Sequence, residues 1–149
     1  MKRIFKLTPL LVLFSYITVQ IGLWHLDNTP PTQVIGPQPV IVAHPGQLVK
    51  VEIPVVRDLS RPCSLLFSRY MVDNSGVYYD IMATRFLSHQ GWVDIEKAAP
   101  HEIKFSMDVP KNIPLGKAVV TTQKAFMCNP LQYIWPLDVE IKVTLQIEP

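Results

Sequence analysis

Hydrophobic and polar residues alternate along several short stretches of this chain, and the alternation predicts β-strands with one buried face. The clearest stretch is 139–147, where Val139 and every second residue to Ile147 are apolar and the residues between them are polar. Residues 49–55 and 103–109 alternate in the same way. Aromatic and β-branched residues add four further stretches. We therefore expect seven strands, at 40–43, 49–55, 63–72, 77–86, 103–109, 117–128 and 139–147.

Turn-forming residues separate these stretches at intervals of roughly ten residues, and fourteen prolines contribute to the breaks. Asp73-Asn74-Ser75-Gly76 predicts a tight turn, so the strands on either side of it should form a hairpin. Residues 92–100 have no clear pattern, and we interpret them as a loop with at most a short helical turn. This spacing predicts an all-β fold, a seven-stranded antiparallel sandwich of immunoglobulin-like architecture.

One long stretch, residues 7–24, is mainly apolar and contains no charged residue. As a helix that rises about 1.5 Å per residue it would span about 27 Å, close to the apolar thickness of a bilayer. We interpret it as a transmembrane helix that follows a cytoplasmic basic tail, residues 1–6. Basic residues before a membrane helix favour a cytoplasmic N-terminus, and aromatic residues collect at the interface. The flanking anchors are Lys2, Arg3, Lys6 and Trp24.

A cleaved signal peptide is the alternative, because it also begins with basic residues and an apolar core. The residue pairs before a cut, such as Thr18 with Gln20 and Gln20 with Gly22, lack the small-x-small pattern that cleavage requires. We expect a single-pass protein of a bacterial inner membrane with its C-terminal part in the periplasm. Residues 25–38 should form a Pro-rich stalk, unless their last part lies along the domain, and residues 39–149 the sandwich domain.

The two cysteines should form one disulfide, because an exported domain folds in an oxidising compartment. Cys63 begins the third expected strand and Cys128 ends the sixth. In a sandwich of this topology those strands are antiparallel neighbours, so the two ends meet at one pole of the domain. Closing a loop of about 65 residues stabilises a fold by about 3–4 kcal/mol.

Composition and motifs give no support for catalysis or nucleic-acid binding. The net charge is +2, the basic residues are dispersed, and the four histidines have no metal-ligand spacing. No Gly-x-Ser-x-Gly, His-Glu-x-x-His or phosphate-binding glycine loop occurs. Asp73-Asn74-Ser75-Gly76 lacks the later ligands of a calcium loop. We expect a protein that is not an enzyme, with no metal, no cofactor and no evident small-molecule substrate, whose partners are the lipid bilayer and an unidentified envelope protein.

The most unusual stretch is the loop of residues 128–136, Cys-Asn-Pro-Leu-Gln-Tyr-Ile-Trp-Pro. Its apolar members form the candidate binding loop: Leu131, Tyr133, Ile134 and Trp135. Such a loop either covers the disulfide or presents an apolar surface to a partner. Because Pro130 and Pro136 restrict the loop and a buried disulfide needs cover, we expect packing. The N-terminal segment should join the domain at this same pole, and Pro149 should lie at the far pole.

The layout of a basic N-terminus, one membrane helix, a Pro-rich stalk and a domain that ends in Cys-Asn-Pro-Leu-Gln-x-x-x-Pro resembles a group of small membrane-anchored proteins encoded by tailed phages. Cys63, residues 128–132 and Pro136 carry the motif. The resemblance implies a phage or prophage origin and implies no activity. We therefore expect an exported interaction module at the host envelope. The alternatives are a structural subunit of an envelope assembly and a soluble domain secreted after signal cleavage.

Overall fold

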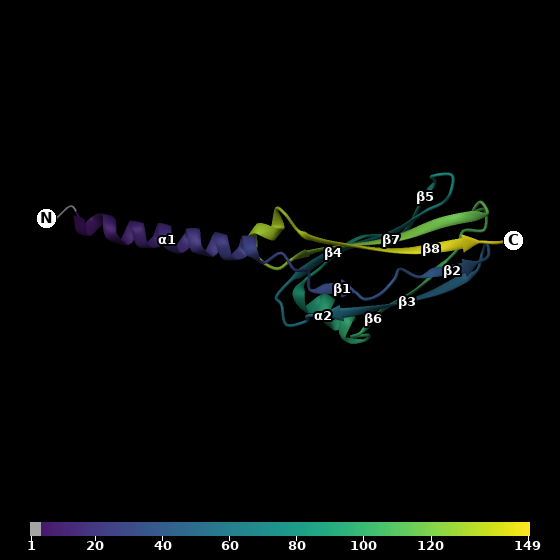
Figure 1. The fold of residues 1–149 in the computed structure, drawn as a ribbon, viewed down its shortest axis with the longest axis horizontal. Coiled ribbons are helices and arrows are strands. Elements are labelled where there is room, and N and C mark those ends of the chain that lie inside the picture. The colour runs from purple at the N-terminus through teal and green to yellow at the C-terminus, as the bar shows by residue number, and fades with distance from the viewer. Residues whose placement is uncertain (1–3) are drawn as a thin grey trace.

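A computed structural model describes residues 4–149 and shows a long N-terminal helix that leads into a domain of two β-sheets (Figure 1). The helices are α1 (Ile4–Leu26), α2 (His89–Lys97) and the short 3-10 helix η1 (Pro130–Tyr133). The strands are β1 (Thr32–Val34), β2 (Val40–Ala43), β3 (Leu48–Arg57), β4 (Ser64–Val72), β5 (Tyr78–Leu87), β6 (Glu102–Asp108), β7 (Gly116–Met127) and β8 (Leu137–Ile147). The predicted anchors Lys2 and Arg3 and the side chain of Lys6 lie outside the described residues.

The strands form a three-stranded sheet in the order β1-β3-β6 and a five-stranded sheet in the order β2-β8-β7-β4-β5. The fold is mostly β, as predicted, but it has eight strands where we expected seven. The seven expected stretches are β2 to β8, and β1 is the additional strand. It lies inside the segment expected to be a stalk and pairs with β3, from Thr32 opposite Arg57 to Val34 opposite Val55. These three residues lie among prolines and are too few to show an alternating pattern. Their strand conformation therefore comes from pairing with the free edge of β3.

The larger sheet is not wholly antiparallel, which corrects a second expectation. Strand β2 runs parallel to β8, with Val40 opposite Thr144 and Ala43 opposite Ile147. Both strands run away from the end of the domain where α1 enters, so they point the same way (Figure 1). Gly36, with φ of 81°, lies between β1 and β2, where the chain passes from one sheet to the other in a conformation that glycine adopts most readily.

The predicted alternation places the core between the sheets. Every second residue of β3 from Val49 to Val55 is buried, and so is every second residue of β8 from Ile141 to Ile147. The hairpin is also confirmed, because β4 pairs with β5 up to Val72 opposite Tyr78. The Oδ1 of Asp73 accepts hydrogen bonds from the backbone N–H groups of Ser75 and Val77, at 2.9 and 3.0 Å, and so fixes the turn.

Helix α2 occupies most of a segment that we expected to be a loop. The Oγ of Ser88 accepts from the backbone N–H of Gly91 at 3.3 Å and so caps the helix. Trp92, Val93 and Glu96 are buried against the domain, at a spacing that puts them on one helix face. The structure therefore corrects the loop assignment for this segment.

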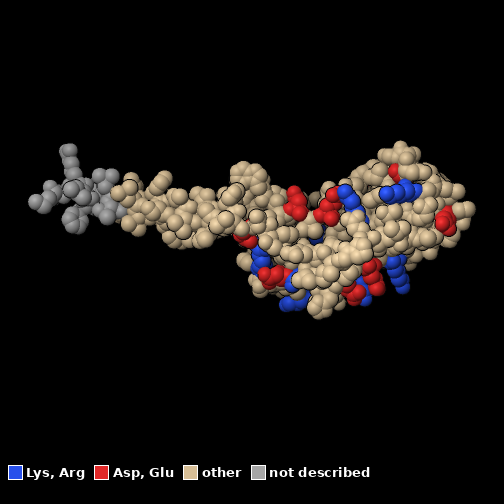
Figure 2. Space-filling model, in the orientation of Figure 1, with Lys and Arg blue, Asp and Glu red and all other residues tan. Residues whose placement is uncertain are grey.

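Helix α1 extends from one end of the domain, and the C-terminus lies at the other end, as expected (Figure 1). The 18 residues Pro9–Leu26 have a mean hydropathy of 1.5 and are not buried within the protein. By length and composition this helix could cross a membrane. In the space-filling view, the tan part of α1 shows no charged side chain, and the charged side chains drawn in red and blue lie on the domain or at the junction with it (Figure 2).

Candidate functional site

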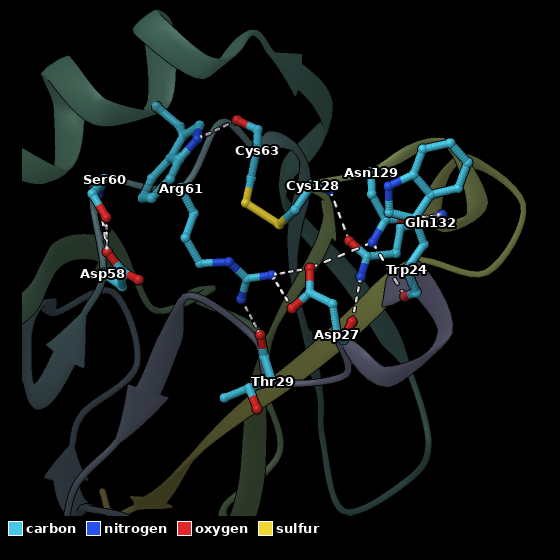
Figure 3. The surroundings of a disulfide bond; sticks show 11 residues. Trp24, Asp27, Thr29, Asp58, Ser60, Arg61, Cys63, Cys128, Asn129 and Gln132 are labelled. Carbon is cyan, nitrogen blue, oxygen red and sulfur yellow. Dashed lines mark hydrogen bonds and ion pairs between the residues drawn. A yellow bond between two sulfur atoms is a disulfide. The ribbon is translucent and has the colours of Figure 1, made fainter. Parts of the chain in front are cut away.

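The predicted disulfide forms between Cys63 and Cys128 at the end of the domain that carries α1 (Figure 3). Cys63 precedes β4 and Cys128 follows β7, and these strands are antiparallel neighbours, with Ser64 opposite Met127. The strand ends therefore meet at one pole, as the topology argument required. The disulfide cross-links one sheet at the point where helix α1 meets the domain.

An ion pair fixes the chain just after α1 beside this disulfide (Figure 3). One terminal nitrogen of Arg61, two residues before Cys63, lies 2.5 Å from Oδ1 and 2.6 Å from Oδ2 of Asp27. The other terminal nitrogen donates to the backbone carbonyl of Thr29. The Arg61 side chain is 18% exposed and that of Asp27 is 38% exposed, so water reaches the pair and weakens it. Its geometric effect is to hold the segment that follows α1 against the loop that precedes Cys63.

Two amides from η1 complete this attachment. The Nε2 of Gln132 donates to the backbone carbonyl of Asp27 at 2.7 Å, and its Oε1 accepts from the backbone N–H of Cys128 at 2.8 Å. The Oδ1 of Asn129 caps η1 by accepting from the backbone N–H groups of residues 131 and 132. Its Nδ2 donates to the carbonyl of Trp24, in the last turn of α1, at 3.4 Å. We refer to Asp27, Arg61, Asn129 and Gln132 as the helix clasp.

The helix clasp explains the Cys-Asn-Pro-Leu-Gln motif. Cys128 bonds through the disulfide to Cys63, which precedes β4, and Asn129 caps both η1 and the end of α1. Pro130 starts η1 at a position where a missing N–H costs little, and Gln132 links the loop to Asp27. The motif residues therefore attach helix α1 to the domain.

The cover over the disulfide is not the loop that we expected. Trp92 of α2 is 0% exposed, its indole N–H donates to the carbonyl of Cys63 at 2.5 Å, and its ring meets Phe126 edge-on. The candidate binding loop turns outward instead, with Tyr133 62%, Ile134 67% and Trp135 69% exposed. The packing prediction is therefore wrong, because Trp92 of α2, from a segment that the sequence pattern left as a loop, already covers the disulfide.

The outward side chains of the loop lie next to the end of helix α1. A hollow of about 550 Å³ separates α1 from the loop, and its walls include Ile21, Trp24, Leu131, Trp135 and Leu137. Most of this surface is apolar. The loop itself lies at the end of the domain that carries α1 (Figure 1). An exposed apolar surface of this kind marks an interaction site with protein or lipid.

Sequence reasoning missed three residues of this junction. They are Asp27, Arg61 and Trp92, none of which belongs to a motif or to a predicted site. A signal for Trp92 was present, because Ser88 is a favoured helix cap and Trp92, Val93 and Glu96 have helical spacing. No comparable local signal pairs Asp27 with Arg61, since the contact depends on the tertiary fold.

Across residues 4–149, no group of three or more histidine, cysteine or acidic residues is arranged to hold a metal ion. No protein-family model matches this chain, and no curated protein is detectably similar to it. The function is therefore argued from the geometry of the molecule.

Proposed function

We propose that this protein is a single-pass interaction module of a bacterial inner membrane, with its β-sandwich held directly against the periplasmic face. The basic residues before α1 support a cytoplasmic N-terminus, and the disulfide suits an oxidising compartment. The resemblance of the motif and layout to small proteins of tailed phages adds a phage or prophage origin to this proposal.

The helix clasp is the observation that carries the proposal. The apolar stretch ends at Leu26, and the very next residue, Asp27, is already bonded to Arg61 and Gln132 of the domain. No free stalk separates the bilayer from the sandwich. Tyr133 and Trp135 therefore lie at the depth of the lipid headgroups, where amphipathic aromatic rings are favoured.

An immunoglobulin-like arrangement is part of the same proposal. Among β2 to β8, the third, sixth and seventh strands share one sheet, and the fourth extends that sheet beside the third. This order matches the extended sheet of variable-type immunoglobulin domains. Domains of this architecture present loops and sheet edges to partners, which suits an interaction module better than an enzyme.

The free edge of β5 favours a second candidate function, that of a structural subunit. Strand β5 is the last strand of its sheet, pairs only with β4, and exposes Tyr78 (60%) and Phe86 (58%). Such an edge can accept a strand from a partner protein. A structural subunit would form a stoichiometric complex through this edge.

Protease access in spheroplasts tests the orientation. Because the C-terminus lies at the far end of the domain, a C-terminal epitope tag should be removed by protease added outside, and an N-terminal tag should be protected. The reverse pattern contradicts the orientation.

Intact-mass measurement of the membrane fraction separates the secreted alternative, since a mature chain that begins between residues 22 and 28 would show cleavage. A stoichiometric complex that Tyr78→Lys disrupts would favour the structural subunit.

A further inference from the structure

Three basic side chains lie buried between the two sheets, on the side where α2 packs. They are Arg57 at the end of β3, Arg69 of β4 and Lys124 of β7. The side chains of Arg57 and Lys124 are each 3% exposed, and Arg69 is 5% exposed as a whole residue. Burial of this much positive charge is unfavourable unless a counterion compensates it.

The domain supplies one buried carboxylate for these three cations. Glu96 of α2 forms an ion pair with Arg57 through Oε2 and with Lys124 through Oε1, the latter at 2.7 Å. Arg57 also donates to the backbone carbonyl of Glu102 at 2.9 Å. Three positive charges therefore face one negative charge, and the third cation, Arg69, is left over.

Arg69 has few partners of its own. Its Nε donates to the Oγ1 of Thr122 at 2.8 Å, and the face of its guanidinium lies 3.5 Å from the ring centroid of Phe105. Within the described residues, no carboxylate pairs with it and no protein oxygen accepts from its two terminal nitrogens. Burial lowers the pKa of Arg69 to about 10, so the group is still charged at neutral pH. Burial also lowers the pKa of Lys124 below its usual value, and the opposing effect of nearby Glu96 offsets this only in part.

A cavity of about 300 Å³ adjoins this cluster, within the size range of small-ligand sites. Arg69 and Lys124 line it together with Arg85, an exposed residue of β5. The charged residues Arg57, Glu96, Glu102 and Lys104 also line it, so its five basic side chains outnumber its two carboxylates. Its remaining walls are apolar and include Phe67, Leu87, Ile95 and Phe105. The cavity therefore joins an uncompensated positive charge to an apolar surface.

Stacking on Phe105 provides a purely structural role for Arg69, since a cation over a ring is stabilised. It uses only the face of the guanidinium, however, and leaves the N–H donors of the two terminal nitrogens free. Those donors form a planar fork that matches the two oxygens of a carboxylate or phosphate group. A structural role alone does not explain an unfilled fork beside a cavity.

We propose that this cavity binds a small organic anion, in which one acid group is carried on an apolar body. The acid oxygens accept hydrogen bonds from Arg69 and Lys124, and the apolar body lies against Phe67 and Leu87. Arg85 lies beside the cavity and attracts the anion. This site goes beyond the membrane-anchored role and does not depend on the orientation of the chain.

Calorimetric titration of the full chain in lipid nanodiscs tests the proposal. The probes are benzoate and phenyl phosphate, with benzamide as a neutral probe of the same shape as benzoate. At least one of the two anions should bind saturably. If benzoate binds, benzamide should bind at least tenfold more weakly, because charge-assisted hydrogen bonds are stronger than neutral ones. The absence of saturable binding for both anions, or equal binding of benzoate and benzamide, would overturn the proposal.

Matched variants locate the binding. Arg69→Gln should weaken it by about 10- to 100-fold, whereas Lys117→Gln, which removes one exposed charge elsewhere on β7, should leave it unchanged. If Arg69→Gln does not fold, Arg85→Gln should still fold and should weaken binding by about 2- to 5-fold. Undiminished binding in Arg69→Gln or, where that variant does not fold, in Arg85→Gln would also overturn the proposal.

Discussion

Gln132 joins three parts of the molecule through one side-chain amide. It is 4% exposed, and from η1 it connects the backbone of the disulfide residue Cys128 to the backbone of Asp27, just after helix α1. A buried backbone group that loses its partner is costly, so this position tolerates little change. The neighbouring Tyr133 has the opposite character, because it is 62% exposed and makes no comparable link. Adjacent residues of one short loop therefore have different roles: Gln132 stabilises the fold, and Tyr133 is part of the exposed surface.

Two tryptophans separate these roles experimentally. Trp92→Ala should lower the free energy of unfolding by about 3–5 kcal/mol, because the ring is 0% exposed and its indole N–H bonds to Cys63. Trp135→Ala should change it by less than about 0.5 kcal/mol, because that ring is 69% exposed. Chemical denaturation followed by circular dichroism measures both. A large effect of Trp135→Ala would mean that the loop packs on the disulfide after all.

At the scale of elements, the strands with one buried face were predictable from sequence. In β3 and β8 the core removes every second side chain from water, so the alternation is visible in the residues themselves. The same alternation, continued along β4, puts Arg69 on the inward face with Leu65 and Met71, but an alternation rule gives no role to a charge there. The inward position of this charge is therefore predictable from the alternation, but its chemical role is not.

The remaining elements depend on tertiary contacts. Strand β1 exists because β3 offers a free edge, and its three residues have no period of their own. The parallel pairing of β2 with β8 follows from where the chain enters the domain, which no local pattern encodes. The ion pair between Asp27 and Arg61 joins two loops, and loop sequences carry little information about which residues they contact.

Removal of the disulfide tests how β4 and β7 are held together. The double variant Cys63→Ala, Cys128→Ala should lose about 2–4 kcal/mol of stability, because the bond closes a loop of 65 residues. Thermal melting should show a decrease of several degrees or more. Thiol labelling of the unreduced, denatured wild type should detect no free sulfhydryl. Two labelled thiols per chain would contradict the pairing.

At the scale of the whole molecule, the clasp and the cavity serve different parts of the proposed role. The clasp and the apolar loop lie at the α1 end of the domain, while the cavity opens between the sheets beside α2 and β5. A domain fixed at its base leaves the side with the cavity free to reach solutes. The attachment therefore limits the motion of the sandwich without closing the anion site.

The final prediction concerns the depth of the loop in the bilayer. If the clasp holds the sandwich against the membrane, Trp135 lies among the headgroups, and lipids brominated near the headgroup should quench its fluorescence. The Trp24→Phe variant isolates this signal, because the only other tryptophan, Trp92, is fully buried in the domain. Quenching in Trp24→Phe that disappears in Trp24→Phe, Trp135→Phe is the expected result. Equal fluorescence of Trp24→Phe in brominated and ordinary nanodiscs would place the domain clear of the bilayer, with the apolar loop left for a protein partner.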